Sequence, residues 1–225
     1  MSRRNKLDRF RDNQQRRNVI EPGKDHYFKM KGQWRSSFFF NQNPLVIEVG
    51  CGRGEYTVGL AGIFEDHNFV GIDIKGDRIW VGSGQAIQKG MDNVAFLRTQ
   101  VQFLDRFFEE NEVDTIWLTF PDPRPKDRDE KRRLTFPGYL ELYKKVLKKD
   151  GWFRFKTDNT ELFDYTLNLF EKKEVLVKNL AFTRDLYASD LVDEHHGIKT
   201  KYEKIWYDKG ERIKYMKFKF DHGVP

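Results

Sequence analysis

Short apolar runs alternate with amphipathic helical periods along most of this chain. The first run, Leu45–Val49, is followed by a cluster of glycines and by a helical period over 55–64. Further strands are expected at 69–74, 94–97, 113–120 and 152–157, and further helices at 77–89, 101–108, 137–149 and 160–172. Strands that alternate with helices of this length predict a parallel sheet with helices on both faces.

The end of the chain follows a different period. Segments 175–182 and 213–220 are strand-like, and the side chains of the second segment alternate with a period of two. This period suits a strand that has one solvated face and pairs antiparallel with its neighbour. We therefore predict a Rossmann-like α/β fold in which a mostly parallel central sheet ends in an antiparallel edge strand.

Composition narrows the class of protein. Aromatic residues make up 15% of the 225 residues, which is too much bulky apolar surface for a disordered chain. The single cysteine excludes a disulfide scaffold. The longest uncharged stretch, 36–47, is shorter than the roughly 20 apolar residues of a membrane-spanning helix, and the start of the chain lacks the apolar core of a secretory signal. We therefore expect a cytoplasmic protein with no membrane partner.

The positive charge is concentrated at the start of the chain. The net charge is +6, and residues 1–35 hold eleven Lys or Arg residues against four acids, so the rest of the chain is almost neutral. We predict a basic, flexible N-terminal arm over 1–35 and one domain over 36–225, with Trp34 and the phenylalanines at 38–40 packing the end of the arm onto the domain. Such an arm is either a solvated tail or a phosphate-binding segment.

A glycine loop follows the first buried strand. Gly50, Gly52 and Gly54 allow a tight turn and a close approach of the backbone to a ligand. Asp73, at the end of the second strand, is placed to meet ribose hydroxyls. Glu48, just before the loop, would repel a pyrophosphate but suits a sulfonium or an amino group, which favours S-adenosylmethionine over NAD. The alternatives are ordinary caps: Glu48 for the loop amides and Asp73 for the next helix.

A second loop, 120–126, follows the fourth strand and reads Phe-Pro-Asp-Pro-Arg-Pro-Lys. Ligands of open parallel sheets bind beyond the carboxyl ends of the strands, and the prolines hold Asp122 in a stiff loop there. The following charge run, 126–133, is either a solvated face or a surface for phosphates beside the site.

These motifs together resemble the bacterial tRNA (guanine-N7-)-methyltransferase family. The family pattern is E-x-G-x-G-x-G, G-I-E, F-P-D-P-W-x-K, T-D and T-K-F-E. The matching segments here occur in the same order and include Thr157-Asp158 and Thr200-Lys201-Tyr202-Glu203. The resemblance covers about residues 40–220. It implies a class I methyltransferase fold, S-adenosylmethionine as cofactor, tRNA as partner, and transfer of a methyl group to N7 of a guanosine in the variable loop.

The resemblance also implies roles for single residues, and it implies neither a metal ion nor an obligatory protein partner. Asp122 corresponds to the catalytic residue. Three positions depart from the pattern: Asp73 replaces Glu, Gln100 replaces Asp, and Arg124 replaces Trp. The implied cofactor-binding residues are Glu48, Gly50, Gly52, Gly54, Asp73, Gln100 and Asp122, and the implied substrate-binding residues are Lys126, Asp158, Thr200, Lys201, Tyr202 and Glu203.

Several alternatives stay open at this point. The chain could be a nicotinamide oxidoreductase, an RNA methyltransferase acting on an amino group, or a non-catalytic RNA-binding module. Asp158 could cap the helix that starts near Thr160, and 200–203 could begin an edge strand. His195 and His196 could belong to a metal site, although adjacent histidines rarely point the same way. If the partner is tRNA, we expect the arm to contribute to tRNA affinity and not to cofactor binding.

Overall fold

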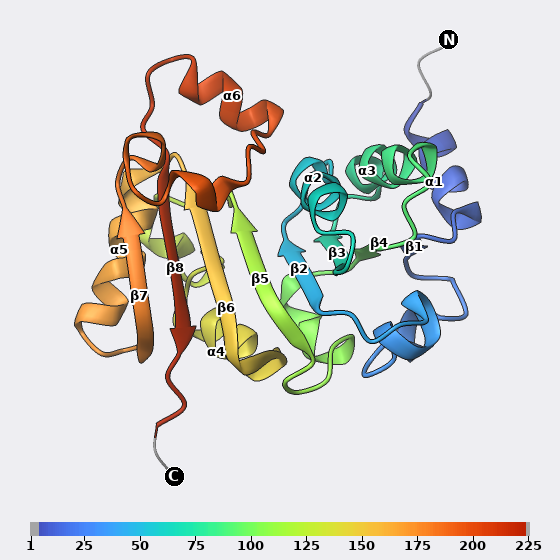
Figure 1. Ribbon diagram of the computed structural model, residues 1–225, viewed down its shortest axis with the longest axis horizontal. Coiled ribbons are helices and arrows are strands. Elements are labelled where there is room, and N and C mark those ends of the chain that lie inside the picture. Colours follow the sequence, from blue (N-terminus) through green and yellow to red (C-terminus); the bar gives the residue numbers. More distant parts are fainter. Residues whose placement is uncertain (1–4, 224–225) are drawn as a thin grey trace.

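The computed structural model describes residues 5–223, which form one eight-stranded sheet with the order β1-β4-β3-β2-β5-β6-β8-β7 (Figure 1). Strands β1 to β6 run parallel, and β8 pairs antiparallel with both β6 and β7. The strands are β1 (Val19–Ile20), β2 (Leu45–Val49), β3 (Asn68–Asp73), β4 (Val94–Arg98), β5 (Val113–Thr119), β6 (Leu147–Thr157), β7 (Val177–Thr183) and β8 (Lys214–Phe220).

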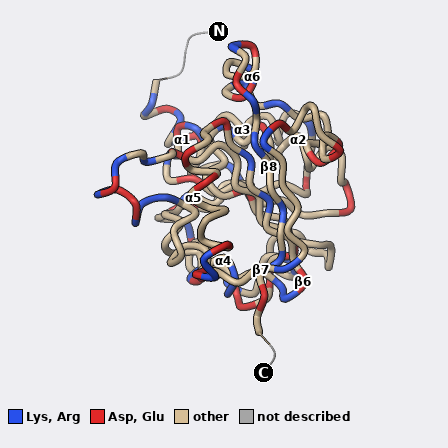
Figure 2. Tube along the Cα trace, turned by 90° about the vertical axis from the view of Figure 1, so that its left-hand side faces the viewer, with Lys and Arg blue, Asp and Glu red and all other residues tan. Residues whose placement is uncertain are grey.

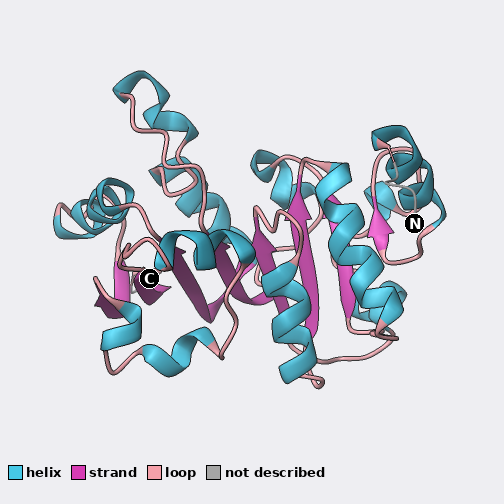
Figure 3. Ribbon diagram, turned by 90° about the horizontal axis from the view of Figure 1, so that it is seen from above, coloured by secondary structure: helices cyan, strands magenta, loops and turns pink. Residues whose placement is uncertain are grey.

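Helices cover both faces of the sheet, as Figure 3 shows from above. On one face, helices α2 and α3 pack with the segment 186–198 around one apolar cluster. On the other face, α4, α5 and η3 pack around a second and larger cluster. The helices are α1 (Lys6–Gln15), α2 (Glu55–Ile63), α3 (Gly76–Gln88), α4 (Pro137–Val146), α5 (Thr160–Glu171) and α6 (Lys201–Tyr207), and the short ones are η1 (Tyr27–Lys29), η2 (Trp34–Phe39), η3 (Val101–Arg106), η4 (Asp127–Arg132), η5 (Leu186–Ala188) and η6 (Val192–His195).

The predicted parallel sheet with helices on both faces is confirmed, with differences at several boundaries. The antiparallel strand predicted at the chain end is β8, which lies second from the edge because β7 pairs along its outer side. Helix α4 ends at Val146 rather than at 149, because Leu147 already pairs with Val113 of β5. Within residues 5–223, no helix is long and apolar enough to cross a membrane.

The N-terminal segment differs from the predicted flexible arm. Its described part, 5–35, folds into α1, the short strand β1, and η1, and it packs on the domain. Val19 and Trp34 are fully buried, and Val19 pairs with Phe96 of β4. The amino-acid composition did not indicate this packing, because several of the contacts that hold the segment are made by buried polar groups. Asn13, for example, is buried and donates to the backbone oxygen of Gly76 (2.8 Å). Residues 1–4 of the predicted arm lie outside the described residues.

Candidate active site

The glycine loop connects β2 to α2. All three glycines have positive φ, at 72°, 55° and 71° for Gly50, Gly52 and Gly54. A Cβ on Gly54 would lie 2.5 Å from Cε1 of Phe96, so only glycine allows the start of α2 to pack this closely on β4. A Cβ on Gly52 would meet no atom within 4 Å. The loop therefore has one glycine that packs the helix and one whose backbone faces open space.

Glu48 lies beneath the loop and is only 4% exposed. One carboxylate oxygen accepts hydrogen bonds from the backbone N–H (2.9 Å) and the hydroxyl of Thr57, and the other accepts from the hydroxyl of Thr119 (2.6 Å). Glu48 thus caps the first turn of α2 rather than the loop amides. Burial raises the pKa of Glu48 to about 7 despite these three hydrogen bonds.

Asp73 ends β3 beside the glycine loop and is 9% exposed. Its Oδ2 accepts from the backbone N–H of Gly52 (3.0 Å) and its Oδ1 from that of Lys75 (2.7 Å). Each carboxylate oxygen can accept a second hydrogen bond. Gln100 lies two residues beyond β4, and its exposed side chain forms no hydrogen bond with the described residues. Asp73 at the end of β3, beside Gly52, and the exposed Gln100 beyond the neighbouring strand β4 are thus two polar groups available to a ligand at this edge of the sheet.

Asp122 lies beyond the end of β5 with 63% of its side chain exposed. Its partner is Arg124, whose Nε is 3.1 Å from Oδ2 and whose backbone N–H donates to Oδ1 (3.3 Å). Phe120 and Arg124 both have positive φ, so the proline-rich loop turns sharply on both sides of Asp122. The residue that replaces the family tryptophan therefore holds the predicted catalytic acid.

Asp158 directly follows β6, which is the strand next to β5 in the sheet. It does not cap α5, because Asn159 occupies that position and accepts from the backbone N–H of Leu162 (2.7 Å). Its carboxylate instead accepts from the hydroxyl of Tyr202 (3.3 Å). Burial raises the pKa of Asp158. The ring of Tyr202 lies 5.6 Å from that of Phe120, and burial, with the charges of Asp158 and Asp122, raises the pKa of Tyr202. Tyr202 thus connects the two acidic loops.

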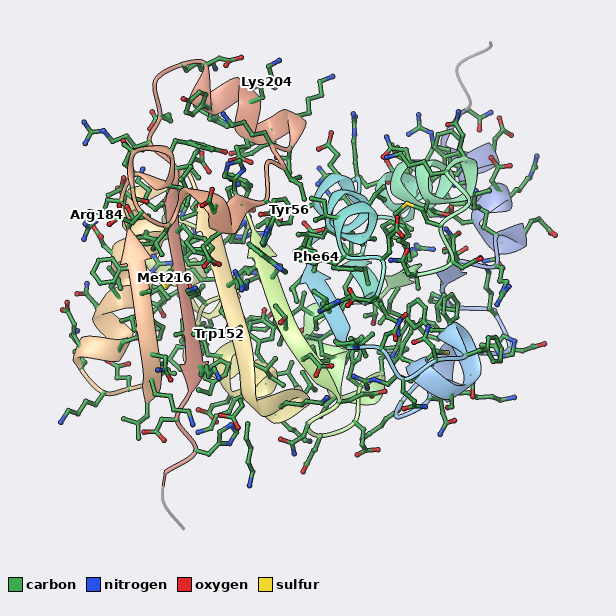
Figure 4. All side chains as sticks on the ribbon, in the orientation of Figure 1. Tyr56, Phe64, Trp152, Arg184, Lys204 and Met216 are labelled. Carbon is green, nitrogen blue, oxygen red and sulfur yellow. The ribbon has the colours of Figure 1, made fainter. Side chains whose placement is uncertain are left out.

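The segment 200–203 begins helix α6 and not an edge strand. Thr200 and Glu203 form a capping box, in which the hydroxyl of Thr200 accepts from the N–H of Glu203 (3.1 Å) and the carboxylate accepts from the N–H of Thr200 (3.3 Å). The sequence Thr-x-x-Glu carries this signal. Both residues are buried, whereas Lys201 and Tyr202 are exposed. Helix α6 holds Lys201, Glu203 and Lys204, so both basic and acidic positions appear on it in Figure 2, and Lys204 lies on its outer side (Figure 4).

A buried lysine below α6 escaped the sequence analysis. Lys156, near the end of β6, and Glu203 are both 0% exposed, and Nζ lies 2.7 Å from Oε1. The hydroxyl of Tyr187 also donates to this carboxylate. The ammonium is 5.3 Å from the ring centroid of Tyr56 and 5.9 Å from that of Phe120. A lysine within an otherwise apolar strand could have indicated this pair from the sequence, because a buried ammonium group needs a buried partner of opposite charge.

The loop that contains the two histidines packs across the sheet. Glu194 accepts hydrogen bonds from Arg154 and Lys217 on neighbouring strands, and the hydroxyl of Tyr56, labelled in Figure 4, donates to the backbone oxygen of His195 (3.3 Å). Among residues 5–223, no group of three His, Cys, Asp or Glu side chains is placed to hold a metal ion. The loop is therefore tied to the sheet by ion pairs and hydrogen bonds.

The structure brings most of the predicted residues to one edge of the sheet. Glu48, Asp73, Asp122 and Asp158 lie at or beyond the carboxyl ends of four parallel strands, of which β2, β5 and β6 are seen to point the same way in Figure 1. Lys126 lies at the start of η4, and its side chain has no partner among the described residues. A hollow of about 620 Å³ between the end of α1 and the start of β4 contains none of the predicted residues.

The strand order, the glycine loop after a central strand and the acid at the end of the next strand define a class I methyltransferase. Solved structures share this fold at low sequence identity. The 16S rRNA methyltransferase KamB is 14% identical with a TM-score of 0.61, covering 88% of this chain and 94% of that one. A SAM-dependent methyltransferase from Aquifex aeolicus is 13% identical with a TM-score of 0.53, covering 97% and 100%.

Comparison with related sequences gives the family. A family model described as "Putative methyltransferase" matches residues 42–216. The tRNA (guanine-N(7)-)-methyltransferase of Cytophaga hutchinsonii is 46% identical over 217 residues, which cover 96% of this chain and 98% of that protein. The protein of the same name from Bacteroides fragilis is 49% identical over 218 residues, 95% of this chain and 85% of that protein. The chain belongs to the tRNA (guanine-N7-)-methyltransferase family.

Proposed function

We propose that this protein transfers a methyl group from S-adenosylmethionine to N7 of a guanosine in the variable loop of tRNA. The observation that carries the proposal is the place of the exposed Tyr202, which donates to Asp158 and packs on Phe120 at the start of the Asp122 loop. The backbone N–H of the preceding residue, Lys201, donates to Glu55 directly after the glycine loop (3.1 Å). Near-complete coverage by relatives of that name supports the choice of tRNA as substrate.

The open glycine loop fits S-adenosylmethionine. Gly52 leaves room for a ligand at the turn, and Asp73 retains lone pairs for ribose hydroxyls. In this proposal Asp73 and Gln100 hold the adenosine half, and Gly50, Gly52 and Gly54 shape the loop. Both carboxylate oxygens of Glu48 already accept hydrogen bonds from Thr57 and Thr119. Glu48 therefore acts on the cationic amino acid half of the cofactor through its negative charge, without touching it.

The reaction requires positioning and charge compensation. When bound, S-adenosylmethionine supplies a methyl group on a positively charged sulfur. Guanine N7 attacks with its own lone pair and carries no proton, so no general base is needed, and the positive charge passes to the purine ring. Asp122 and Asp158 accept hydrogen bonds from the N–H groups of the guanine and offset this charge. Lys126 and Lys201, both exposed, bind phosphates, and Tyr202 lies against the base.

Thr200 and Glu203 have an indirect part in this proposal. Both side chains are buried, and each accepts a hydrogen bond from the backbone N–H of the other residue, while the carboxylate of Glu203 also pairs with Lys156. They therefore fix the start of α6, which presents Lys201 and Tyr202 to the substrate. The implied substrate-binding segment divides into two residues that face the substrate and two that hold the helix.

Incubation of undermodified tRNA with labelled S-adenosylmethionine, followed by nucleoside analysis, tests the reaction. We expect label only in 7-methylguanosine, because N7 attacks with its own lone pair while the N–H groups of the guanine stay hydrogen-bonded to the two carboxylates. Label in a nucleoside methylated on an amino group would support the amino-group alternative. Binding of tRNA without any incorporation would support an RNA-binding module.

The raised pKa of Glu48 predicts a pH-dependent affinity for the cofactor. Near pH 7 this carboxyl is partly protonated, and a cationic ligand favours its ionised form, so binding at lower pH must release a proton. We expect the affinity for S-adenosylmethionine to fall about tenfold between pH 8 and pH 6. Calorimetry at both pH values measures this change. In Glu48→Gln only ionisation of the ligand itself remains, and an equal pH dependence in that variant would contradict the assignment.

A further inference from the structure

The N-terminal helix α1 lies on the start of α3, next to the proposed adenosine subsite. Asn13 donates to the backbone oxygen of Gly76. The ring of Phe10 covers the same glycine, where an added Cβ would lie only 2.6 Å from its Cε1. Gly76 is three residues beyond Asp73, and Figure 1 shows α1 alongside α3. The position of the turn after Asp73 is therefore set partly by α1.

Arg98 connects the same segment to the end of the neighbouring strand. It is the last residue of β4, two residues before Gln100. Its guanidinium donates to the fully buried carboxylate of Glu21 (3.3 Å) and to the backbone oxygen of Ile74 (3.3 Å), and it lies 4.8 Å from the ring centroid of Phe10. One side chain thus joins the N-terminal segment to both strands that carry the proposed adenosine contacts.

Two arginines, one in α1 and one directly after it, are directed at the domain. Arg9 and Arg16 lie on the ring of Trp80 of α3, each 5.0 Å from its centroid, and Nε1 of Trp80 donates to Asp12 (2.8 Å). These contacts order α1 and engage part of the positive charge expected to bind tRNA. Part of the positive charge of the N-terminal segment therefore stabilises the packing of this segment on the domain.

We propose that the N-terminal segment positions the adenosine half of the cofactor site, with Phe10 and Arg98 as positioning residues. The segment holds the turn after Asp73 and the end of β4 at a fixed separation, so the ligand meets a preformed site. This inference rests on the proposed function, because it assumes S-adenosylmethionine between Asp73 and Gln100. It assigns the segment a part in cofactor binding in addition to the part in tRNA binding expected from its charge.

Replacement of Phe10 tests this role in the full-length chain. If loss of the ring leaves the subsite formed about a tenth of the time, the Kd and the KM for S-adenosylmethionine rise about tenfold. The kcat at saturating cofactor and the KM for tRNA stay at the wild-type values. Leu7→Ala is the matched control, since Leu7 lies on the same helix with 69% exposure and is expected to leave all four quantities unchanged.

An unchanged Kd for S-adenosylmethionine in a folded Phe10→Ala protein would overturn the proposal. A rise confined to the KM for tRNA would also overturn it and return the segment to RNA binding. If Phe10→Ala does not fold, Glu21→Gln serves instead, since it keeps the shape and removes the charge that holds Arg98; a rise in the cofactor Kd supports the role and an unchanged Kd overturns it. Wild-type protein that fails to bind S-adenosylmethionine would instead contradict the proposed function.

Discussion

Replacing Asp122 by asparagine is expected to lower kcat on tRNA by about a hundredfold or more, the usual cost of removing one preorganised group that stabilises transition-state charge. The substitution keeps the shape of the side chain and removes its negative charge. The charge matters most as the purine becomes cationic, so the loss falls mainly on kcat. Single-turnover methylation with saturating tRNA and S-adenosylmethionine measures the effect.

The control for this variant is Asp129→Asn in η4, which follows the proline-rich loop. Asp129 pairs within this short helix with Arg132 (3.0 Å), whose side chain is 67% exposed, and ion pairs at the surface contribute little. The turnover of Asp129→Asn should therefore equal that of the wild type. Wild-type turnover in Asp122→Asn would show that the carboxylate of Asp122 has no part in the chemistry.

Arg124 gives the same experiment a second readout. In the structure it pairs with Asp122, so bound guanine must compete with this guanidinium or share the carboxylate with it. In Asp122→Asn the ion pair is lost, and we expect the proline-rich loop to become more susceptible to proteolysis while the melting temperature of the domain stays close to that of the wild type.

The sequence predicted the central sheet well because its signal is local. Each strand from β2 to β6 is an apolar run with a helix after it, and the glycine loop and Asp73 follow from their places at strand ends. The packing of the N-terminal segment was not predicted, because single contacts such as Asn13 with Gly76 and Glu21 with Arg98 join residues more than sixty positions apart. No local period reveals pairings of that kind.

The same limit applied to the site. The motifs placed Asp122 and Asp158 at neighbouring strand ends, but the partner of each acid depends on loop geometry. Tyr202 donates to Asp158 from a helix 44 residues away along the chain. The capping box formed by Thr200 and Glu203 was visible in the sequence, whereas the pairing of Glu203 with Lys156 required the folded sheet.

Lys156→Met is expected to produce the largest loss of stability among the substitutions considered. The variant leaves Glu203 buried with no opposing ammonium, and breaking a buried ion pair on one side costs about 3–5 kcal/mol. Chemical denaturation measures this change. Because the pair also holds the start of α6 over β6, we expect the KM for tRNA to rise while the Kd for S-adenosylmethionine stays unchanged.

The double variant Lys156→Met/Glu203→Gln separates the charge from the packing. Replacement of both partners by neutral groups of similar size is often nearly neutral, so we expect most of the lost stability to return. Activity should return with it if α6 is held by packing and by the capping box, because glutamine can still accept from the backbone N–H of Thr200 and from Tyr187.

A surface pair provides the control for this cycle. Lys178 and Asp150 lie 3.7 Å apart with both side chains largely exposed, and such pairs contribute about 0–1 kcal/mol, so Lys178→Met should change stability and tRNA kinetics little. If Lys156→Met is no less stable than Lys178→Met, or if its defect lies in cofactor binding rather than in tRNA, then α6 is not positioned by Lys156. In that case the substrate side of the site must be organised by the capping box, by the contact of Tyr202 with Asp158 and by the hydrogen bond from the N–H of Lys201 to Glu55.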